Sequence, residues 1–153
     1  MPIRKRNACR GLIVSEADEI LLMKIENPSK TWTGWIAPGE THELALRREL
    51  LEELGLEKFE IGPLVWNRIA TFLWDTQRIE QSEAFYFIRT PKFSIEELKN
   101  PDEGEKKSFR GFRWWTLDEI HNSKELFAPR KMGLHLKTLL KEGVPQGPLD
   151  VGT

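Results

Sequence analysis

Cysteine is almost absent from the sequence. Its single copy, Cys9, has no partner within the chain for a disulfide bond, so a disulfide-stapled secreted fold is excluded and a cytoplasmic protein is expected. The sequence also lacks any apolar run near the roughly 18 residues that a membrane-spanning helix requires, so we expect no membrane association. The basic start at residues 4–6 precedes no apolar core, which argues against a secretory signal. A frayed, solvated terminus is favoured there over a nuclear-import patch or a nucleic-acid-binding arm.

An excess of charge of either sign is missing as well. Lys and Arg together number 23, and Asp and Glu number 24, which gives a net charge of −1. No global field therefore draws the chain to nucleic acid or to anionic lipid, and the balance argues against long RNA as a substrate. Internal repeats and low-complexity linkers are absent too, so residues 1–153 are expected to form a single domain.

Short apolar segments predict a sheet. Strands are expected at residues 8–14, 20–23, 65–74, 83–89 and 111–115. Residues 27–41 contain two Pro, two Gly and two Trp, a composition that predicts a structured loop. Residues 92–107 are polar and predict an irregular segment.

Three segments carry the signals of helices. Thr41 is a good N-cap and Gly55 a good terminating residue for a helix over residues 41–54. Residues 116–119 form a capping box that opens a short helix, and an apolar stripe over residues 132–140 predicts a final helix that ends at Gly143. This order of elements predicts an α/β protein with a mixed sheet between helices.

The helix predicted over residues 41–54 has two contrasting sides at about 100° per residue. Its apolar side consists of Leu44, Leu46, Leu50, Leu51 and Leu54, and its opposite side of Glu49, Glu52 and Glu53. Carboxylates at these spacings repel one another, and the helix dipole disfavours them near the C-terminus. Such a cluster suits Mg²⁺ or Mn²⁺, which prefer oxygen ligands. A solvated acidic face balanced by Arg47 and Arg48 would explain the same pattern without a metal.

The spacing around these glutamates resembles the signature of the Nudix hydrolases, the MutT-like enzymes. Residues 34–56 match that signature at every defined position: Gly34, five residues, Glu40, seven residues, Arg48-Glu49-Leu50, one residue, Glu52-Glu53, one residue, Gly55-Leu56. The resemblance implies an α/β/α sandwich with a loop–helix–loop metal site. It also implies a hydrolase that uses Mg²⁺ or Mn²⁺ to cleave the diphosphate linkage of a nucleoside triphosphate or of a small nucleoside-diphosphate derivative. Homodimers are common in the family, so a homodimer is left open.

The resemblance assigns roles within this box. By position, Glu49, Glu52 and Glu53 correspond to the family's metal-binding and catalytic carboxylates. Glu40 and Arg48 are similar to the pair that braces the loop against the helix, and Gly55 corresponds to the helix-terminating glycine. The family also uses a backbone carbonyl of the preceding loop as a metal ligand, and Gly34 is the residue assigned to that role.

The loop before Glu40 allows two alignments with the family. In one, Gly34 opens the box and the usual Pro-Gly pair is missing ahead of it. In the other, residues 35–39, which read Trp-Ile-Ala-Pro-Gly, are the family's Trp-x-x-Pro-Gly element, and a stretch is deleted before Glu40. The sequence leaves both open, and the ligand from this loop depends on the choice.

Residues outside the box are expected to complete the site. Candidates for phosphate binding are Arg10, Arg68 and Arg78, and candidates for stacking on a nucleobase are Trp32, Trp35, Trp66, Phe72 and Trp74. For the aromatic residues, and above all for Trp66, Trp114 and Trp115, packing in the core is the alternative.

An acid on the far side of the metal is expected as a further catalytic group. Glu83 on a strand is preferred over Glu103 or Glu105 in a loop, because a rigid element holds a ligand at a fixed distance.

Two other functions share the fold that the resemblance implies. Isoprenoid diphosphate isomerases need a catalytic cysteine, but Cys9 lies in a predicted strand and has the character of a buried structural thiol. A nucleotide-binding or regulatory module with weak or lost catalysis is the second alternative. Such modules lose box carboxylates, all of which are present here, although the shortened loop keeps this alternative open.

Overall fold

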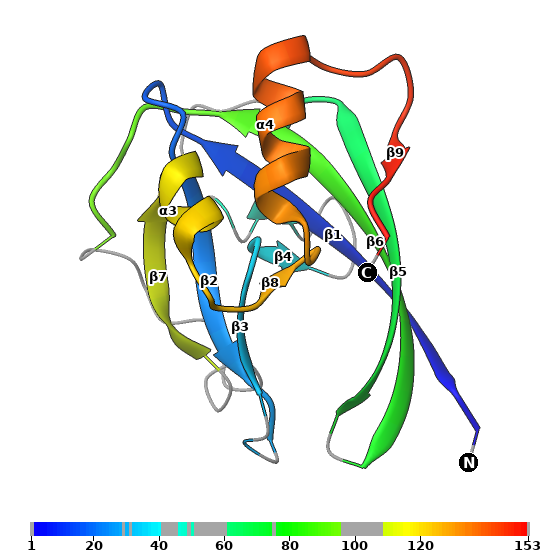
Figure 1. The fold of residues 1–153 in the computed structure, drawn as a ribbon. Coiled ribbons are helices and arrows are strands. Elements are labelled where there is room, and N and C mark those ends of the chain that lie inside the picture. Colours follow the sequence, from blue (N-terminus) through cyan, green and yellow to red (C-terminus); the bar gives the residue numbers. More distant parts are fainter. Residues whose placement is uncertain are drawn as a thin grey trace.

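The computed structural model describes residues 2–28, 30, 32–40, 46–48, 50, 61–74, 76–95 and 109–152. Over these residues, nine strands form one curled sheet (Figure 1). The strands are β1 (Arg4–Val14), β2 (Ile20–Glu26), β3 (Thr33–Ile36), β4 (Gly39–Glu40), β5 (Leu64–Trp74), β6 (Gln77–Arg89), β7 (Phe109–Trp115), β8 (Phe127–Ala128) and β9 (Leu149–Asp150). Two helices are α3 (Leu117–Asn122) and α4 (Met132–Glu142), and residues 46–48 and 50 are also helical.

The sheet is mixed, and β1 lies near its centre. β1 runs parallel to β6 over its whole length, from Arg4 opposite Ile79 to Val14 opposite Arg89. β6 and β5 form a long antiparallel hairpin on one side of β1. On the other side, β2 pairs antiparallel with β1, β3 and β7. The strand order is β8-β3-β2-β1-β6-β5-β9, with β7 on β2 and β4 on β1.

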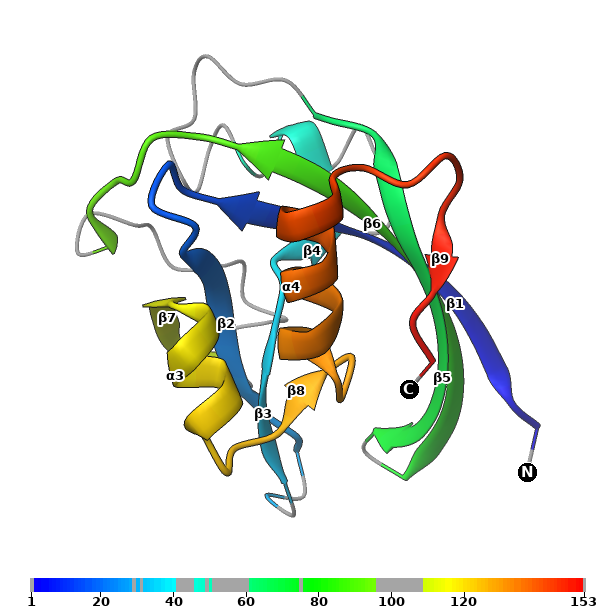
Figure 2. The ribbon, with the colours of Figure 1, turned by 45° about the horizontal axis from the view of Figure 1, so that its top comes forward.

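Helices cover both faces of this sheet. Because side chains alternate along a strand, Leu12 and its neighbour Ile13 on β1 enter different cores. Leu12 packs with Leu136 of α4 in one core, whereas Ile13 packs with Leu46 and Leu50 of the segment around residue 48 in the other. Figure 2 shows α4 lying across one side of the curled sheet. The predicted α/β/α sandwich is thereby confirmed, as is the burial of two of the predicted helix leucines.

The predicted ends of the last two helices are confirmed as well. Before α3, the Thr116 hydroxyl accepts from the Glu119 backbone N–H at 3.1 Å, and the Glu119 carboxylate accepts from the Thr116 backbone N–H at 2.9 Å. α4 ends at Gly143, which has φ 84° and whose N–H donates to the Leu139 carbonyl. Among the described segments, no helix has the length and apolar character needed to cross a membrane.

Three predictions about the strands were wrong. Residues 4–6 are not a frayed terminus but the first part of β1, because backbone pairing with β6 orders them although their side chains are exposed. Residues 27–41 include β3 and β4 rather than loop alone. β6 begins at Gln77, not at Glu83, because pairing in the hairpin extends through polar residues that lack the usual apolar pattern.

Truncation of Leu136 tests the core beneath α4. This side chain is 0% exposed, so Leu136→Ala should lower the free energy of unfolding by about 2–5 kcal/mol through lost burial and a residual cavity. Leu134, on the same helix, is 58% exposed, and Leu134→Ala is the matched control with an expected change of about 0.5 kcal/mol or less. Urea unfolding of both variants measures the difference, and equal losses would contradict the assignment of α4 to the core.

Candidate functional site

The concave face of the β5–β6 hairpin carries most of the candidate site. Alternation along each strand places Gln81 and Glu83 of β6 on one face with Ala70 and Arg68, their cross-strand partners on β5. β1 runs beside β6 and contributes Arg10. Three adjacent strands therefore bring together residues that lie far apart in the sequence.

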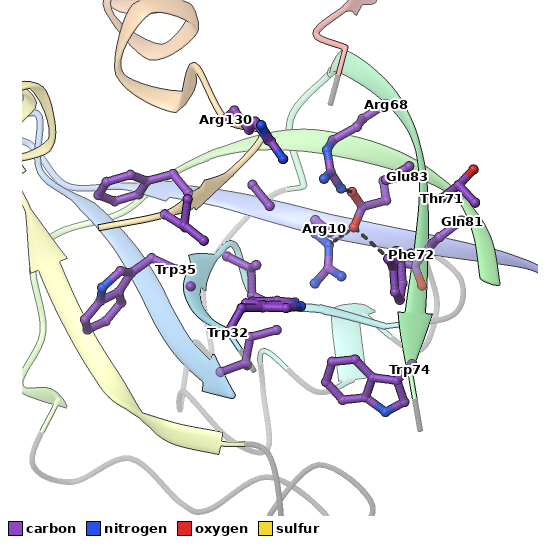
Figure 3. A pocket seen from close by; sticks show the side chains of 17 residues that line it. Arg10, Trp32, Trp35, Arg68, Thr71, Phe72, Trp74, Gln81, Glu83 and Arg130 are labelled. Carbon is purple, nitrogen blue, oxygen red and sulfur yellow. Dashed lines mark hydrogen bonds and ion pairs between the residues drawn. The ribbon is translucent and has the colours of Figure 1, made fainter. Parts of the chain in front are cut away.

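Glu83 lies at the centre of this group and is only 4% exposed. Arg10 Nε donates to Glu83 Oε2, and Arg68 Nη1 donates to Glu83 Oε1. Gln81 Nε2 adds a hydrogen bond to Oε2 at 3.0 Å. These contacts are drawn in Figure 3. A buried carboxylate needs both a countercharge and hydrogen bonds to its oxygens, and this arrangement supplies both.

The two arginines determine the charge state of Glu83. Burial alone raises the pKa of the Glu83 carboxyl, but the charges of Arg10 and Arg68 and their hydrogen bonds lower it by more, so the pKa lies below its ordinary value. Glu83 is therefore ionised at neutral pH. Its oxygens are also engaged by three donors, which leaves the carboxylate little capacity to bind a further proton or cation.

Arg10 connects this group to the loop that precedes Glu40. Its Nη1 donates to the Ala37 carbonyl at 2.9 Å, and the neighbouring Gly11 N–H donates to the Pro38 carbonyl at 2.8 Å. A Cβ on Gly39 would lie 2.6 Å from the Cys9 carbonyl oxygen. The loop is therefore held tightly against β1, and the absence of a side chain at Gly39 is what allows β4 to pair there.

The arginines open into a pocket of about 610 Å³ between the hairpin, β3 and the segment around β8. Its lining includes Arg10, Trp32, Gly34, Trp35, Arg68, Ala70, Thr71, Phe72, Trp74, Gln81, Glu83 and Arg130. The charged members are three arginines and one glutamate, so the lining has a net charge of +2. A concave site with this charge and several aromatic walls suits an anionic aromatic ligand.

The aromatic side chains of the pocket fall into two groups. Trp32 and Trp74 meet edge to face with ring centroids 6.4 Å apart, and Phe72 meets Trp74 in the same way. Trp35 lines the pocket but is only 7% exposed, and it packs on Trp115 in the core. Stacking on a ligand is therefore open to Trp32 and Trp74, whereas Trp35 serves mainly as a wall.

The three tryptophans for which core packing was favoured are buried or partly buried. Trp66 and Trp115 belong to the core around α4, and Trp114 is partly buried with its Nε1 donating to the Phe93 carbonyl. None of the three lines the pocket described above. Packing, the alternative that the sequence favoured for them, is confirmed.

Several predicted box residues lie outside the described part of the chain. These are Glu49, Glu52, Glu53 and Gly55, together with the side chain of Glu40. Arg48 is exposed on its helical segment. Its predicted contact with Glu40 stays a prediction, because the Glu40 side chain lies outside the described part of the chain. Within the described ranges, no three His, Cys, Asp or Glu side chains cluster to hold a metal. The loop acids at positions 103 and 105 also lie outside these ranges.

Gly34 lies on β3 and lines the pocket. A Cβ there would lie 2.9 Å from the Trp32 ring, which gives a packing reason for glycine at this position. The predicted role of its carbonyl as a metal ligand stays a prediction. Arg78, the third arginine considered for phosphate binding, is exposed near the hairpin tip and does not belong to the pocket lining.

The pocket residues that sequence reasoning missed include Gln81 and Arg130. Gln81 could have been found from its spacing of two residues from Glu83, had the strand been extended toward its true start. Arg130 follows β8, a two-residue strand without a recognisable pattern. Only the tertiary fold places it at the pocket.

Comparisons with known proteins bear on both the chain and its fold. The sequence model of the NUDIX domain matches residues 5–136. The chain is 28% identical over 122 residues to the RNA pyrophosphohydrolase of Rickettsia prowazekii (strain Madrid E), a match that covers 76% of this chain and 62% of the relative. The enzyme of the same name from Rickettsia rickettsii (strain Sheila Smith) is 27% identical with the same coverage. The chain thus spans about 62% of the length of these curated relatives.

Solved structures resemble the fold. The MutT protein from Methanosarcina mazei Go1 matches with a TM-score of 0.58 and 17% identity, over 93% of this chain and 97% of that one. The MutT NUDIX hydrolase from Burkholderia pseudomallei matches with a TM-score of 0.52 and 21% identity, over 87% of this chain and 98% of that one. At these identities the likeness establishes the arrangement of strands and helices.

The lowered pKa of Glu83 predicts a pH dependence of stability. A carboxyl with a lowered pKa in the folded state adds stability that is fully present above the ordinary pKa of 4.5 and is lost as the pH falls through its folded value. The free energy of unfolding should therefore decline below about pH 4.5, and the decline should be shallower in Glu83→Gln. Urea titrations from pH 7 to pH 3 measure this. Glu80→Gln removes a carboxylate from the opposite face of β6 and is the control; the same change in slope for both variants would contradict the prediction.

Proposed function

The chain belongs to the NUDIX domain family, and from that premise we propose that it is a divalent-cation-dependent hydrolase that cleaves the diphosphate linkage of a nucleotide. The observation that carries the proposal is a pocket in which arginines lie beside aromatic rings, and in which Arg10 also binds the loop that precedes Glu40. The arginines suit phosphates and the rings suit a nucleobase. Small nucleotides, namely nucleoside triphosphates and nucleoside-diphosphate derivatives, are the proposed substrates.

The box carboxylates are the proposed holders of the cation. Glu49, Glu52 and Glu53 offer the oxygen ligands that Mg²⁺ or Mn²⁺ prefers, and the burial of Leu46 and Leu50 turns the apolar side of that helical segment toward the core. A cation bound there supplies charge neutralisation of the phosphates and acidification of an attacking water. One of the glutamates, with Glu49 as the candidate, takes the proton from that water.

Arg10, Arg68 and Arg130 are proposed to bind the phosphates of the substrate. A guanidinium presents several N–H donors in a plane and can contact a phosphate while another of its nitrogens holds a carboxylate. Arg10 already binds two acceptors through different nitrogens: its Nε donates to Glu83 and its Nη1 to the Ala37 carbonyl. The substrate would therefore be oriented by side chains that are fixed before it arrives, which lowers the entropic cost of reaching the reactive geometry.

Glu83 is proposed to act through these arginines. It was predicted to complete the metal site directly, and that role stays a prediction, since the box glutamates lie outside the described residues. The engagement of both its oxygens favours a positioning role instead. The loop acids Glu103 and Glu105 then become the candidates for an acid or base outside the box.

RNA 5′ ends are a second candidate substrate. Two observations favour them: the curated relatives are named RNA pyrophosphohydrolases, and Arg4, Lys5 and Arg6 form an exposed basic stretch at the start of β1. Exposed Lys and Arg side chains on a β-strand can bind the phosphates of a polynucleotide. A 5′-triphosphorylated oligoribonucleotide therefore belongs in the substrate panel beside the mononucleotides, although the balanced net charge argues against RNA.

Two further expectations stay predictions: a cytoplasmic location and the open possibility of a homodimer.

The alternatives to a hydrolase are tested by the products that are released. Metal-dependent release of phosphate, pyrophosphate or a nucleoside monophosphate supports the enzyme. Binding without turnover would support a regulatory module. An isomerase would depend on Cys9, which lies half-buried on β1 opposite Glu40 of β4.

The box carboxylates give a direct test of the proposed chemistry. Glu53→Gln removes one negative charge and little volume, so the fold should persist while turnover with Mg²⁺ falls about a hundredfold or more. Excess chelator should abolish turnover of the unmodified protein. Glu142→Gln, at the end of α4, is the control and should retain full activity. Phosphate release measures all three, and undiminished turnover in Glu53→Gln would sink the assignment.

The phosphate-binding role of the arginines predicts a different kinetic signature. Arg68→Gln removes a charge-assisted contact worth about 1.5–3 kcal/mol, which corresponds to an increase in KM of roughly tenfold to a hundredfold. The concentration of Mg²⁺ needed for half-maximal activity should stay unchanged, because Arg68 holds no metal. Arg110→Gln is the control, because Arg110 lies exposed on β7 and forms an ion pair with Glu26 of β2. A shift in metal requirement at constant KM would contradict the role.

A further inference from the structure

Gln81 occupies a position in the pocket that the proposed chemistry does not use. It is a polar side chain that is only 5% exposed, yet it lines the pocket. Its Nε2 donates to Glu83 Oε2 at 3.0 Å. This hydrogen bond engages the NH₂ end of the amide, which leaves the carbonyl oxygen, Oε1, as the part of Gln81 that can face a ligand in the pocket.

The neighbouring carboxylate fixes which end of the amide points into the pocket. An ionised carboxylate can only accept hydrogen bonds, so the amide must turn its NH₂ group toward Glu83. The amide carbonyl is then directed away from Glu83. Because Glu83 is held by Arg10 and Arg68, a ligand cannot easily induce the opposite orientation. Gln81 therefore turns its carbonyl oxygen, a hydrogen-bond acceptor, away from Glu83 and keeps its NH₂ group on the side of that carboxylate.

The register of the hairpin places this acceptor between the charged and aromatic parts of the pocket. Gln81 lies opposite Ala70, between the Arg68–Glu83 pair on one side and the Phe72–Ile79 pair on the other. Each of these pairs is two residues away along the strand, a distance of about 7 Å. The methyl group of Ala70 takes little room, which leaves space for a planar ring next to Oε1.

We propose that Gln81 is a specificity-determining residue: its Oε1 accepts a hydrogen bond from an N–H group of the nucleobase, foremost the amino group of a purine. This inference rests on the proposed function, because it assumes a nucleotide whose phosphates lie at the arginines. The base would then extend toward Phe72, Trp74 and Trp32, whose rings can stack on it or border it. A base without an N–H donor leaves Oε1 desolvated and unpaired, which costs affinity.

Equilibrium binding of three nucleotides tests the inference. ATP and GTP carry N–H donors on the base, whereas purine riboside 5′-triphosphate carries none. With Ca²⁺ in place of Mg²⁺ to slow turnover, at least one of the first two should bind about tenfold tighter than the third, the size of effect expected when one hydrogen bond is lost in a desolvated site. Quenching of tryptophan fluorescence can report binding, because Trp32 and Trp74 border the pocket.

Variants at two glutamines assign the preference to Gln81. Gln81→Met keeps the volume but removes the acceptor, so the three nucleotides should bind with similar affinity. Gln77→Met makes the same chemical change four residues away on β6, outside the pocket lining, and should retain the preference. If Gln81→Met does not fold, Gln81→Asn withdraws the carbonyl by one methylene and should reduce the preference.

The possible results separate this inference from the proposed function. Equal binding of all three nucleotides by the unmodified protein, or a preference that survives in Gln81→Met and Gln81→Asn, would overturn the role of Gln81. A preference that depends on Gln81 supports it, even if no nucleotide is hydrolysed with Mg²⁺. That last result would overturn the proposed hydrolase and leave a nucleotide-binding module.

Discussion

The buried Glu83 carboxylate is the interaction on which the candidate site depends. It is held between Arg10 of β1 and Arg68 of β5, and Gln81 completes its hydrogen bonds. Loss of Arg10 or Arg68 would leave the buried carboxylate with one countercharge instead of two, which is more costly than the loss of an exposed ion pair. The adjacent strands β1, β6 and β5 are therefore coupled by charge as well as by backbone pairing.

The same carboxylate links two parts of the molecule with different tasks. Through Arg10 it reaches the Ala37 carbonyl in the loop that leads to Glu40, and through Gln81 it reaches the uncharged part of the pocket. An ion pair inside a pocket of net positive charge also keeps the arginines ordered without cancelling their attraction for phosphate. Rigid placement of this kind favours reaction and discrimination between substrates over simple charge attraction.

Membership of the NUDIX family and the geometry of the pocket contribute different parts of the functional argument. The family match supports the reaction class, since it spans residues 5–136 and includes the box glutamates. The family match does not distinguish among nucleotides. The chain spans about 62% of the length of the named relatives. The residues that would select the substrate lie outside the box: Gln81, Phe72 and Trp74 on the β5–β6 hairpin, and Trp32 just before β3.

The sequence by itself determined the elements whose signals are local. The capping box at Thr116, the C-terminal glycine of α4 at Gly143 and the apolar side of the box helix at Leu46 and Leu50 all depend on residues within a few positions of each other. Their patterns are therefore readable without knowledge of the fold. The sequence also identified Arg10 and Arg68 as candidates for phosphate binding and Glu83 as a candidate acid, but it gave no sign that the three are in contact.

Only the tertiary structure decided how those candidates combine. The parallel pairing of β1 with β6 joins residues about 75 positions apart, and no local pattern encodes that register. This pairing orders residues 4–6, and together with the hairpin it orders residues 77–82, although both segments are mostly polar and give no strand signal. Backbone hydrogen bonds require no particular side chain. The ion pairs of Glu83 and the pocket position of Gln81 follow from that register, since burial and partner choice are properties of neighbouring strands rather than of sequence spacing.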